Sequence, residues 1–309
     1  METKILGISG KKQSGKNTSA NFILGHFMKN VNLINDFHIT TEGQLWIQDI
    51  LGDESIKGAF DIFRKNPEMD KFKENELNHF IQLYSLADLL KENICINVLG
   101  LKREQCYGTD EQKNSETHLR WEDMPGVITD FNSQAYSNWE KEEVKEKPGL
   151  YYKTASGLLS HKGAPTLLAQ CPVNKVIFHA PGPMTGRDVM QFVGTEIFRR
   201  MYGNIWADAT IRKIKQDNPT MAIVCDVRFP NEVEAIQKAG GKVLRFLRDV
   251  YEGQDQHSSE TALDDYPLEK FDWVLDNKEL TAAEQNDAVF QLLKEINWIP
   301  KPFAEYIDV

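Results

Sequence analysis

The chain has 309 residues, of which 41% are hydrophobic, and its formal net charge is −10. This length predicts about two domains, or one large α/β domain with insertions, and the hydrophobic content excludes a disordered chain. The negative charge disfavours non-specific binding to nucleic acid, which depends on Lys and Arg contacts with phosphate. Any phosphate chemistry must therefore use a local basic pocket, and we expect no direct nucleic-acid partner.

The cysteines and the N-terminus favour a cytoplasmic protein. The four cysteines are scattered, lack the spacing of metal ligands and are typical of reduced thiols: Cys95, Cys106, Cys171 and Cys225. The N-terminus leads straight into a predicted strand, so we expect no signal peptide. No apolar run approaches the length of a membrane span, so we expect no membrane partner. The sequence leaves the oligomeric state open, a homodimer included.

The segment from Gly7 to Thr18 has the features of a phosphate-binding P-loop. The apolar run Lys4–Ile8 predicts a buried strand before it, and a run with helical periodicity follows. The apolar face of that helix consists of Ala20, Ile23, Leu24, Phe27 and Met28. A strand, a glycine-rich loop and a helix in this order form an anion site, because backbone N–H groups and the helix N-terminus face the phosphate.

The spacing of Gly10, Gly15 and Lys16 fits this motif, and Lys16 is expected to reach the terminal phosphates. Asn17 departs from the pattern, since Ser or Thr normally holds Mg²⁺ at this position. Thr18 is the expected hydroxyl substitute. The alternative is a glycine-rich turn that binds no ligand.

The middle of the chain gives weaker signals. We expect a second strand at 31–34, a substrate-side insertion at 36–75, and one helix over 77–98 that ends at Gly100. Charged, Gly and Pro residues dominate residues 102–183. This region is predicted to be either a solvated surface excursion or a lid that closes over substrate, and a long loop in a compact domain favours the lid or insertion.

A regular α/β pattern returns in the last third. Strands are expected at Met221–Cys225, Lys242–Leu247 and Trp273–Leu275, and helices are expected to begin at Thr185, Pro230 and Thr281. Asp188 and Glu284 complete capping boxes in two of these helices. Because strands and helices alternate at both ends of the chain, we predict a parallel, doubly wound sheet flanked by helices.

Two groups of polar residues are candidates for binding a second phosphate. On the helix from Thr185, one face carries Arg187, Gln191, Gly194 and Thr195, while the opposite face is apolar and includes Val189 and Met201. The polar face suits a phosphate and a sugar or base, and the alternative is a solvated helix face.

The second group follows the Met221–Cys225 strand. Asp226 is a candidate ligand for Mg²⁺ or ribose, and Arg228 is a candidate for neutralising a transferred phosphoryl group. Glu232 is either a substrate contact or a favourable charge at a helix start. Trp206 is either a base-stacking residue or part of the core.

Two further positions carry weaker signals. Asp88 and Lys91, in the middle of the 77–98 helix, are a third candidate for the site, and the alternative, which their spacing favours, is a surface ion pair. His257 is expected on a loop, either as a nucleotide contact or without a role.

Several segments of the sequence, including those described above, resemble the bacteriophage deoxynucleoside monophosphate kinases. The resemblance lies in Gly10–Thr18, Leu86–Lys91, Leu101–Asn114, Arg120–Pro125, Thr185–Arg199, Cys225–Glu232 and His257–Asp265. These segments are spread over most of the chain, which is more specific than a lone P-loop. The resemblance implies one P-loop kinase domain over residues 1–309, with ATP, Mg²⁺ and a deoxynucleoside 5′-monophosphate (dNMP) as acceptor.

The resemblance also implies roles for individual residues. The ATP loop comprises Gly10, Lys12, Ser14, Gly15, Lys16, Asn17 and Thr18, with Asn17 and Thr18 at the metal. The dNMP positions comprise Arg187, Gln191, Gly194, Thr195, Trp206, Asp226, Arg228 and Glu232. Lys16, Arg187, Asp226 and Arg228 are the expected catalytic residues. The family usually has Asp where this chain has Asn17, and the excursion between Pro125 and Pro183 is longer than usual.

Two other functions stay open from the sequence. One is a P-loop kinase acting on another small phosphorylated molecule. The other is a P-loop switch or ATPase without a small acceptor, which the paired Arg187 and Arg228 groups argue against, because a simple ATPase needs no second phosphate pocket.

Overall fold

A computed structural model describes residues 3–47, 58–60, 71–129, 152–154, 157–159, 177–249 and 262–300. The chain divides into two compact units: Met1–Asn93 with Ile197–Val309, and Ile94–Glu196. The second unit contains the whole 102–183 region. That this region is a lid or insertion of a single kinase domain stays a prediction, and His257 lies outside the described residues.

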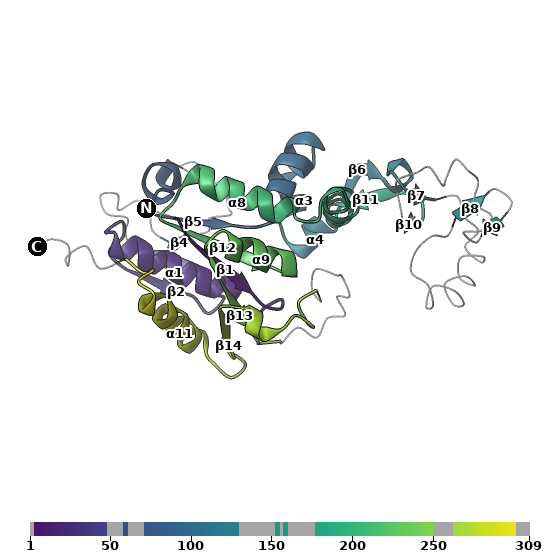
Figure 1. Cartoon of the computed structure of the whole chain (residues 1–309). Coiled ribbons are helices and arrows are strands. Elements are labelled where there is room, and N and C mark those ends of the chain that lie inside the picture. The colour runs from purple at the N-terminus through teal and green to yellow at the C-terminus, as the bar shows by residue number, and fades with distance from the viewer. Residues whose placement is uncertain are drawn as a thin grey trace, which may run out of the picture. The chain divides into compact units, whose positions relative to one another are not determined.

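The first unit is built on a parallel sheet of five strands in the order β14-β13-β1-β12-β5. Its strands are β1 (Lys4–Ser9), β5 (Ile81–Tyr84), β12 (Met221–Val227), β13 (Lys242–Phe246) and β14 (Trp273–Leu275). Its helices are α1 (Lys16–Asn30), η1 (Lys73–Leu77), α8 (Ile205–Asp217), α9 (Pro230–Lys238), η6 (Leu268–Lys270) and α11 (Ala282–Glu295). The predicted parallel α/β sheet flanked by helices is confirmed (Figure 1).

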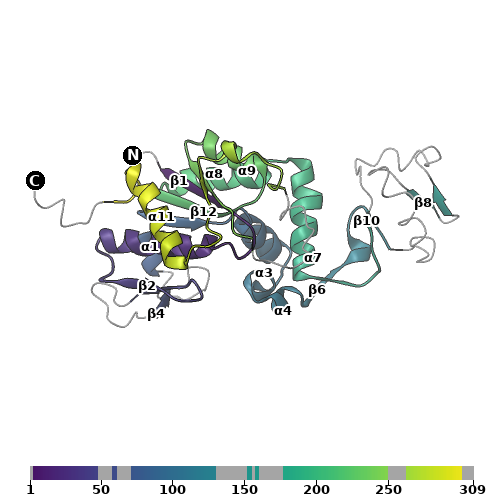
Figure 2. The same cartoon turned by 90° about the horizontal axis from the view of Figure 1, so that it is seen from below.

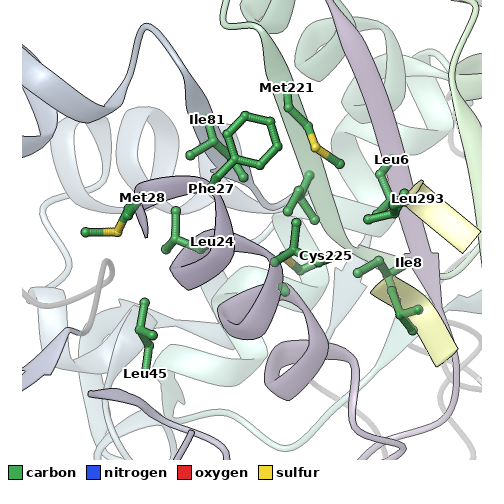
Figure 3. Close-up of a cluster of buried hydrophobic side chains, with 14 of the residues drawn as sticks. Leu6, Ile8, Leu24, Phe27, Met28, Leu45, Ile81, Met221, Cys225 and Leu293 are labelled. Atoms are coloured by element: carbon green, nitrogen blue, oxygen red, sulfur yellow. The ribbon is translucent and has the colours of Figure 1, made fainter. Parts of the chain in front are cut away.

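Alternating side chains of the central strands pack on opposite faces of the sheet. Leu6 of β1 and Ile223 of β12 join a core with α1 and α11, whereas Ile5 and Val224, their neighbours in sequence, join a second core with α8 and α9. Figure 3 shows the first core, in which Leu24 and Phe27 of α1 lie with Met221 and Leu293. Because both faces are covered by helices, the central strands read as continuous apolar runs.

A small antiparallel sheet lies beside α1 (Figure 2). It comprises β2 (Phe37–Ile39), β3 (Leu45–Ile47) and β4 (Gly58–Phe60). The predicted strand at 31–34 is wrong: Leu33 N–H donates to Met28 O at 2.8 Å and Asn32 has a positive φ of 61°, so the segment closes α1. The strand begins only at Phe37.

The predicted helix over 77–98 is also wrong in its first half. Ile81–Tyr84 is strand β5, which pairs in parallel with Met221–Val224 of β12. Helical structure follows and includes η2 (Leu90–Val98), and the predicted cap at Gly100 is confirmed by its φ of 71° and by Leu101 N–H donating to Cys95 O at 2.9 Å. Pairing with a buried central strand outweighed the apolar spacing that suggested a helix.

The second unit begins more regularly than the sequence predicted. Its elements are α3 (Arg103–Tyr107), α4 (Asp110–Lys113), β6 (Glu116–Arg120), η3 (Trp121–Asp123), β7 (Val127–Ile128), β8 (Tyr152–Thr154), β9 (Gly157–Leu159), β10 (Ile177–Phe178), β11 (Pro183–Thr185) and α7 (Gly186–Gln191). Strands β6 and β11 pair antiparallel. Buried Gln105 links α3 to β6, because its Nε2 donates to Glu116 O at 2.9 Å.

The predicted elements of the last third are present. Capping boxes at Thr185 and Thr281 begin α7 and α11, and Pro230 begins α9. Helix α7 continues as η5 (Phe192–Arg199). Met201 does not belong to an apolar packing face, since it is 75% exposed. Helix α8 was not predicted from the sequence. Among the described residues, no helix combines the length and apolar character needed to cross a membrane.

Candidate active site

The P-loop connects β1 to α1 at the carboxyl edge of the sheet. Gly15 stands before the first residue of α1 with φ 93°, a left-handed conformation that favours glycine. A Cβ on Gly10 would stand 2.4 Å from Ser14 Oγ, so the loop is too tight there for a side chain. The predicted strand, loop and helix are therefore confirmed, in the conformation in which backbone N–H groups gather around an anion.

Lys16 folds back over this loop. Its Nζ donates to Gly10 O at 2.7 Å and to Lys11 O at 2.6 Å. Lys12 lies half-buried in the same loop, and Lys11 forms an ion pair with Asp264. The Ser14 hydroxyl is fully buried and has no hydrogen-bond partner among the residues that the structure describes, so it is available as a further donor of the loop. Glycines, a lysine and an unused hydroxyl form a donor set that fits the phosphates of a nucleotide.

The two predicted metal positions differ in environment. Asn17 is exposed at the start of α1. The Thr18 hydroxyl instead lies against the turn before β3, since a Cβ on Gly43 would stand 2.3 Å from Thr18 Oγ1. Mg²⁺ commonly takes only one or two protein oxygens and completes its shell with water and phosphates. Asn17 fits this modest requirement, whereas the Thr18 hydroxyl is directed elsewhere.

Strand pairing brings the second predicted group to the P-loop. Ser9, the last residue of β1, pairs with Val227 of β12, so Asp226 and Arg228 lie beside the start of the loop. On its other side Ser9 pairs with Arg245 of β13, whose Nη1 donates to Ser9 Oγ at 2.9 Å. Parallel strands place their carboxyl ends at one edge, which is where ligands of open α/β sheets bind.

Asp226 is held by the segment that follows β5. Its Oδ2 accepts a hydrogen bond from Ser85 Oγ at 2.6 Å, and its Oδ1 accepts one from Leu86 N–H at 2.8 Å. Asp88 was predicted to lie in the middle of a helix. It lies instead at the start of one, where its carboxylate accepts from Ser85 N–H at 2.9 Å. Ser85 was not a candidate from the sequence, because a helix was predicted there in place of strand β5.

The pKa of the Cys225 thiol responds to charged residues near this edge of the sheet. Burial raises the pKa of its thiol, and the carboxylates of Asp226 and Asp88 raise it further, while Lys16 opposes them. Cys225 is therefore a buried thiol and not a nucleophile.

Glu232 is buried, with 2% of its surface exposed. Its Oε2 accepts from the N–H groups of Arg228 at 2.8 Å and Phe229 at 3.0 Å, and its Oε1 accepts from Arg199 Nη2 at 2.9 Å. Burial raises the pKa of the carboxyl, although these donors oppose the shift. The contacts favour the helix-start alternative, with Arg199 as a partner that the sequence did not reveal.

The remaining candidates divide between the two units. Trp206 lies in α8, 7% exposed, with its ring centroid 5.4 Å from that of Phe198, which favours the core alternative. Arg187, Gln191, Gly194 and Thr195 lie in the second unit, so their part in a shared site stays a prediction. There Arg187 Nη2 donates to Asp110 Oδ1 at 2.8 Å, while its buried Nε has no hydrogen-bond partner within the described part of the chain. Gln191 is exposed and Gly194 is buried.

Comparisons with known proteins point to one family. A family model described as deoxynucleotide monophosphate kinase matches residues 69–284. A deoxynucleoside-5′-monophosphate kinase of Escherichia phage T5 is 40% identical over 53 residues, which cover 17% of this chain and 21% of that protein. A putative deoxynucleotide monophosphate kinase of Acanthamoeba polyphaga mimivirus is 30% identical over 105 residues, 30% of this chain and 53% of that protein. The matches thus span about a fifth and about half of these relatives.

Replacement of Glu232 tests its role at the start of α9. Glu232→Ala leaves two backbone N–H groups and a guanidinium without their acceptor, so we expect the free energy of unfolding to fall by about 3 kcal/mol. Urea denaturation measures this loss. Glu234→Ala, on the exposed side of the same helix, serves as the control and should change stability by less than about 0.5 kcal/mol. Unchanged stability of Glu232→Ala combined with weaker dNMP binding would instead make Glu232 a substrate contact.

Proposed function

Because the chain belongs to the deoxynucleotide monophosphate kinase family, we propose that it transfers the γ-phosphoryl group of ATP to a dNMP, giving a deoxynucleoside diphosphate and ADP. The observation that carries the proposal is the pairing of Ser9 with Val227, which sets the P-loop beside Asp226 and Arg228. This pairing supports a single edge of the sheet that holds both the donor phosphates, at the P-loop, and a cation for the group in transit, at Arg228. In the cytoplasm, the reaction supplies precursors of DNA.

On the donor side, the backbone N–H groups of the P-loop and the N-terminus of α1 bind the ATP phosphates. Lys16 is bound to loop carbonyls, which place its ammonium group at the loop itself. When phosphate oxygens replace these carbonyls as acceptors, Lys16 neutralises charge on the donor. Lys12 and the Ser14 hydroxyl are further donors from the same loop.

On the acceptor side, little general-base help is needed. The second pKa of a phosphate monoester is around 6, so the acceptor is mostly dianionic at pH 7. An acceptor oxygen forms a bond to the γ-phosphorus while the bond from that phosphorus to the bridging oxygen of ADP breaks. The obstacle is the approach of two anions, which Arg228 and Arg187 offset by charge neutralisation and alignment. Gln191, Gly194 and Thr195 are proposed to contact the nucleoside.

Asp226 is proposed to act at the metal, from a carboxylate that hydrogen bonds hold in place. Both of its carboxylate oxygens are bonded to the Ser85–Leu86 segment, which fixes the carboxylate beside the loop. Mg²⁺, when bound with ATP, supplies positive charge to the phosphates. Asn17 is the residue proposed to hold it, and the fixed carboxylate of Asp226 is placed to attract the ion or its water.

A panel of acceptors tests the proposed reaction. We expect ADP to form rapidly with ATP and dNMPs, and slowly with ATP alone or with phosphorylated metabolites that lack a nucleoside. A coupled assay of ADP formation, with each product identified by chromatography, measures this. ATP hydrolysis at the same rate with and without an acceptor would identify an ATPase, and preference for a non-nucleotide phosphate would identify another small-molecule kinase.

Removal of either cation at the sheet edge is expected to abolish most turnover. Lys16→Ala and Arg228→Ala should each lower kcat by about a thousandfold, because neutralisation of the transferred group is the main catalytic effect. Circular dichroism should show that both variants remain folded. Arg212→Ala, which removes an exposed cation of α8, is the control and should keep the kcat of the unmodified protein. Near-normal turnover by Lys16→Ala or Arg228→Ala would refute the role of that residue.

The two metal candidates are separable by mutation. A chelator should abolish activity and added Mg²⁺ should restore it. Asn17→Ala should raise the Mg²⁺ concentration for half-maximal activity severalfold, since one protein oxygen is lost. Thr18→Val, which has nearly the same shape, should leave this concentration unchanged because the hydroxyl faces Gly43. The reverse pattern would assign the metal to Thr18.

A further inference from the structure

Two buried amide side chains lie directly beneath the P-loop. Asn277 follows β14 and Gln285 lies on α11, and their exposed fractions are 0% and 1%. Asn277 Nδ2 donates to Ser14 O at 2.8 Å and to Gln285 Oε1 at 2.6 Å. Gln285 Nε2 donates to Gly15 O at 3.1 Å and to Ser19 Oγ at 2.8 Å. All four N–H bonds of the two amides are therefore used, in a network that includes two loop carbonyls.

The network also fills the space under the loop. A Cβ on Gly15 would stand 2.5 Å from Gln285 Nε2, so the amide packs directly on the glycine backbone. At the Asn277 end of the network, Arg248 holds the amide in place. Its backbone N–H donates to Asn277 Oδ1 at 2.8 Å and its Nη2 donates to Asn277 O at 2.6 Å. A fully satisfied polar network at this depth holds its members in one arrangement.

The geometry of the peptide group relates the direction of each loop carbonyl to that of the N–H group that follows it. In a trans peptide group the C=O and the following N–H point in opposite directions. Ser14 C=O is in one group with Gly15 N–H, and Gly15 C=O is in one group with Lys16 N–H. Ser14 O accepts from Asn277, whereas Gly15 O accepts from Gln285 and also from Ser19 N–H at 3.0 Å, in the first turn of α1. With both carbonyls held in this way, we expect the two N–H groups to face the opposite side of the loop, where an anion binds.

We propose that Asn277 and Gln285 are positioning residues for the donor nucleotide: by holding the carbonyls of Ser14 and Gly15 they aim the N–H groups of Gly15 and Lys16 at the ATP phosphates. The inference rests on the proposed function for its ligand, and it adds residues outside the P-loop motif to the donor site. Apolar side chains of the same size would fill the space but would leave Ser14 O without its side-chain donor.

A pair of neighbouring buried amides on α11 gives a matched test. Gln285→Met keeps the size of the side chain and removes its bond to Gly15 O. Asn286→Leu removes a buried amide with 3% exposure that accepts from Ser19 Oγ at 2.9 Å and contacts neither loop carbonyl through a hydrogen bond. Thermal melting measures stability, and calorimetric titration with ATP and with a dNMP measures affinity. Steady-state kinetics then gives KM for each substrate.

Both variants are expected to melt at lower temperature than the unmodified chain. Only Gln285→Met should raise the Kd and KM for ATP, by about tenfold, while its Kd and KM for the dNMP stay the same. Should Gln285→Met not fold, Gln285→Asn, whose amide is too short to reach Gly15 O, takes its place.

Two results would overturn the inference: ATP affinity of the Gln285 variant equal to that of the unmodified chain, or equal losses of ATP affinity in the Gln285 and Asn286 variants. Failure of the unmodified chain to bind ATP is a separate result, which overturns the proposed function as well.

Discussion

Parallel pairing on both sides of β1 is the constraint on which the site depends. The backbone ladder sets Ser9 opposite Val227 on one side and opposite Arg245 on the other. Residues more than 200 positions apart are thereby fixed at one edge, whatever their side chains do. The P-loop, Asp226 and Arg228 share this edge because hydrogen bonds between strands determine where each strand ends.

The chain is acidic overall, but cationic residues gather at the edge of the sheet where the anion site is proposed. The net charge is −10, yet the central strands and the loop carry Lys16, Arg228 and Arg245 at one edge. Carboxylates near this edge are engaged: Asp226 accepts from Ser85 and Leu86, and Glu232 accepts from Arg199 and two backbone N–H groups. Each engaged carboxylate therefore has donors of its own, which lessens its repulsion of an arriving phosphate.

The parts of the fold that were predictable have local causes. The P-loop, the capping boxes at Thr185 and Thr281 and the buried run Met221–Cys225 each follow from a few adjacent residues. Strand β5 was not predictable in this way, because its apolar residues also fit a helix and only pairing with β12 decides between them. The same error hid Ser85, since a residue placed within a helix gives no reason to look for a contact with Asp226.

The candidate site, like the fold, was predictable from the sequence only in part. Position after a strand correctly placed Asp226 and Arg228 beside the loop, and the helix-start alternative for Glu232 was visible in the sequence. Asn277 and Gln285 carried no signal, because an amide that serves a loop some 260 positions away resembles any other amide. Asn17 and Thr18 both stay proposed metal residues, and the contact of the Thr18 hydroxyl with the turn at Gly43, which favours Asn17, is not visible in the sequence.

The dependence of the loop on Asn277 and Gln285 has a consequence for synthesis. Ribosomes deliver the N-terminal end first, so a nascent chain that has emerged only as far as β13 already carries the glycines and Lys16. It still lacks the amides that hold Ser14 O and Gly15 O from sequence separations of 263 and 270. The earliest part of the polypeptide thus acquires its finished shape among the last, once α11 has left the exit tunnel.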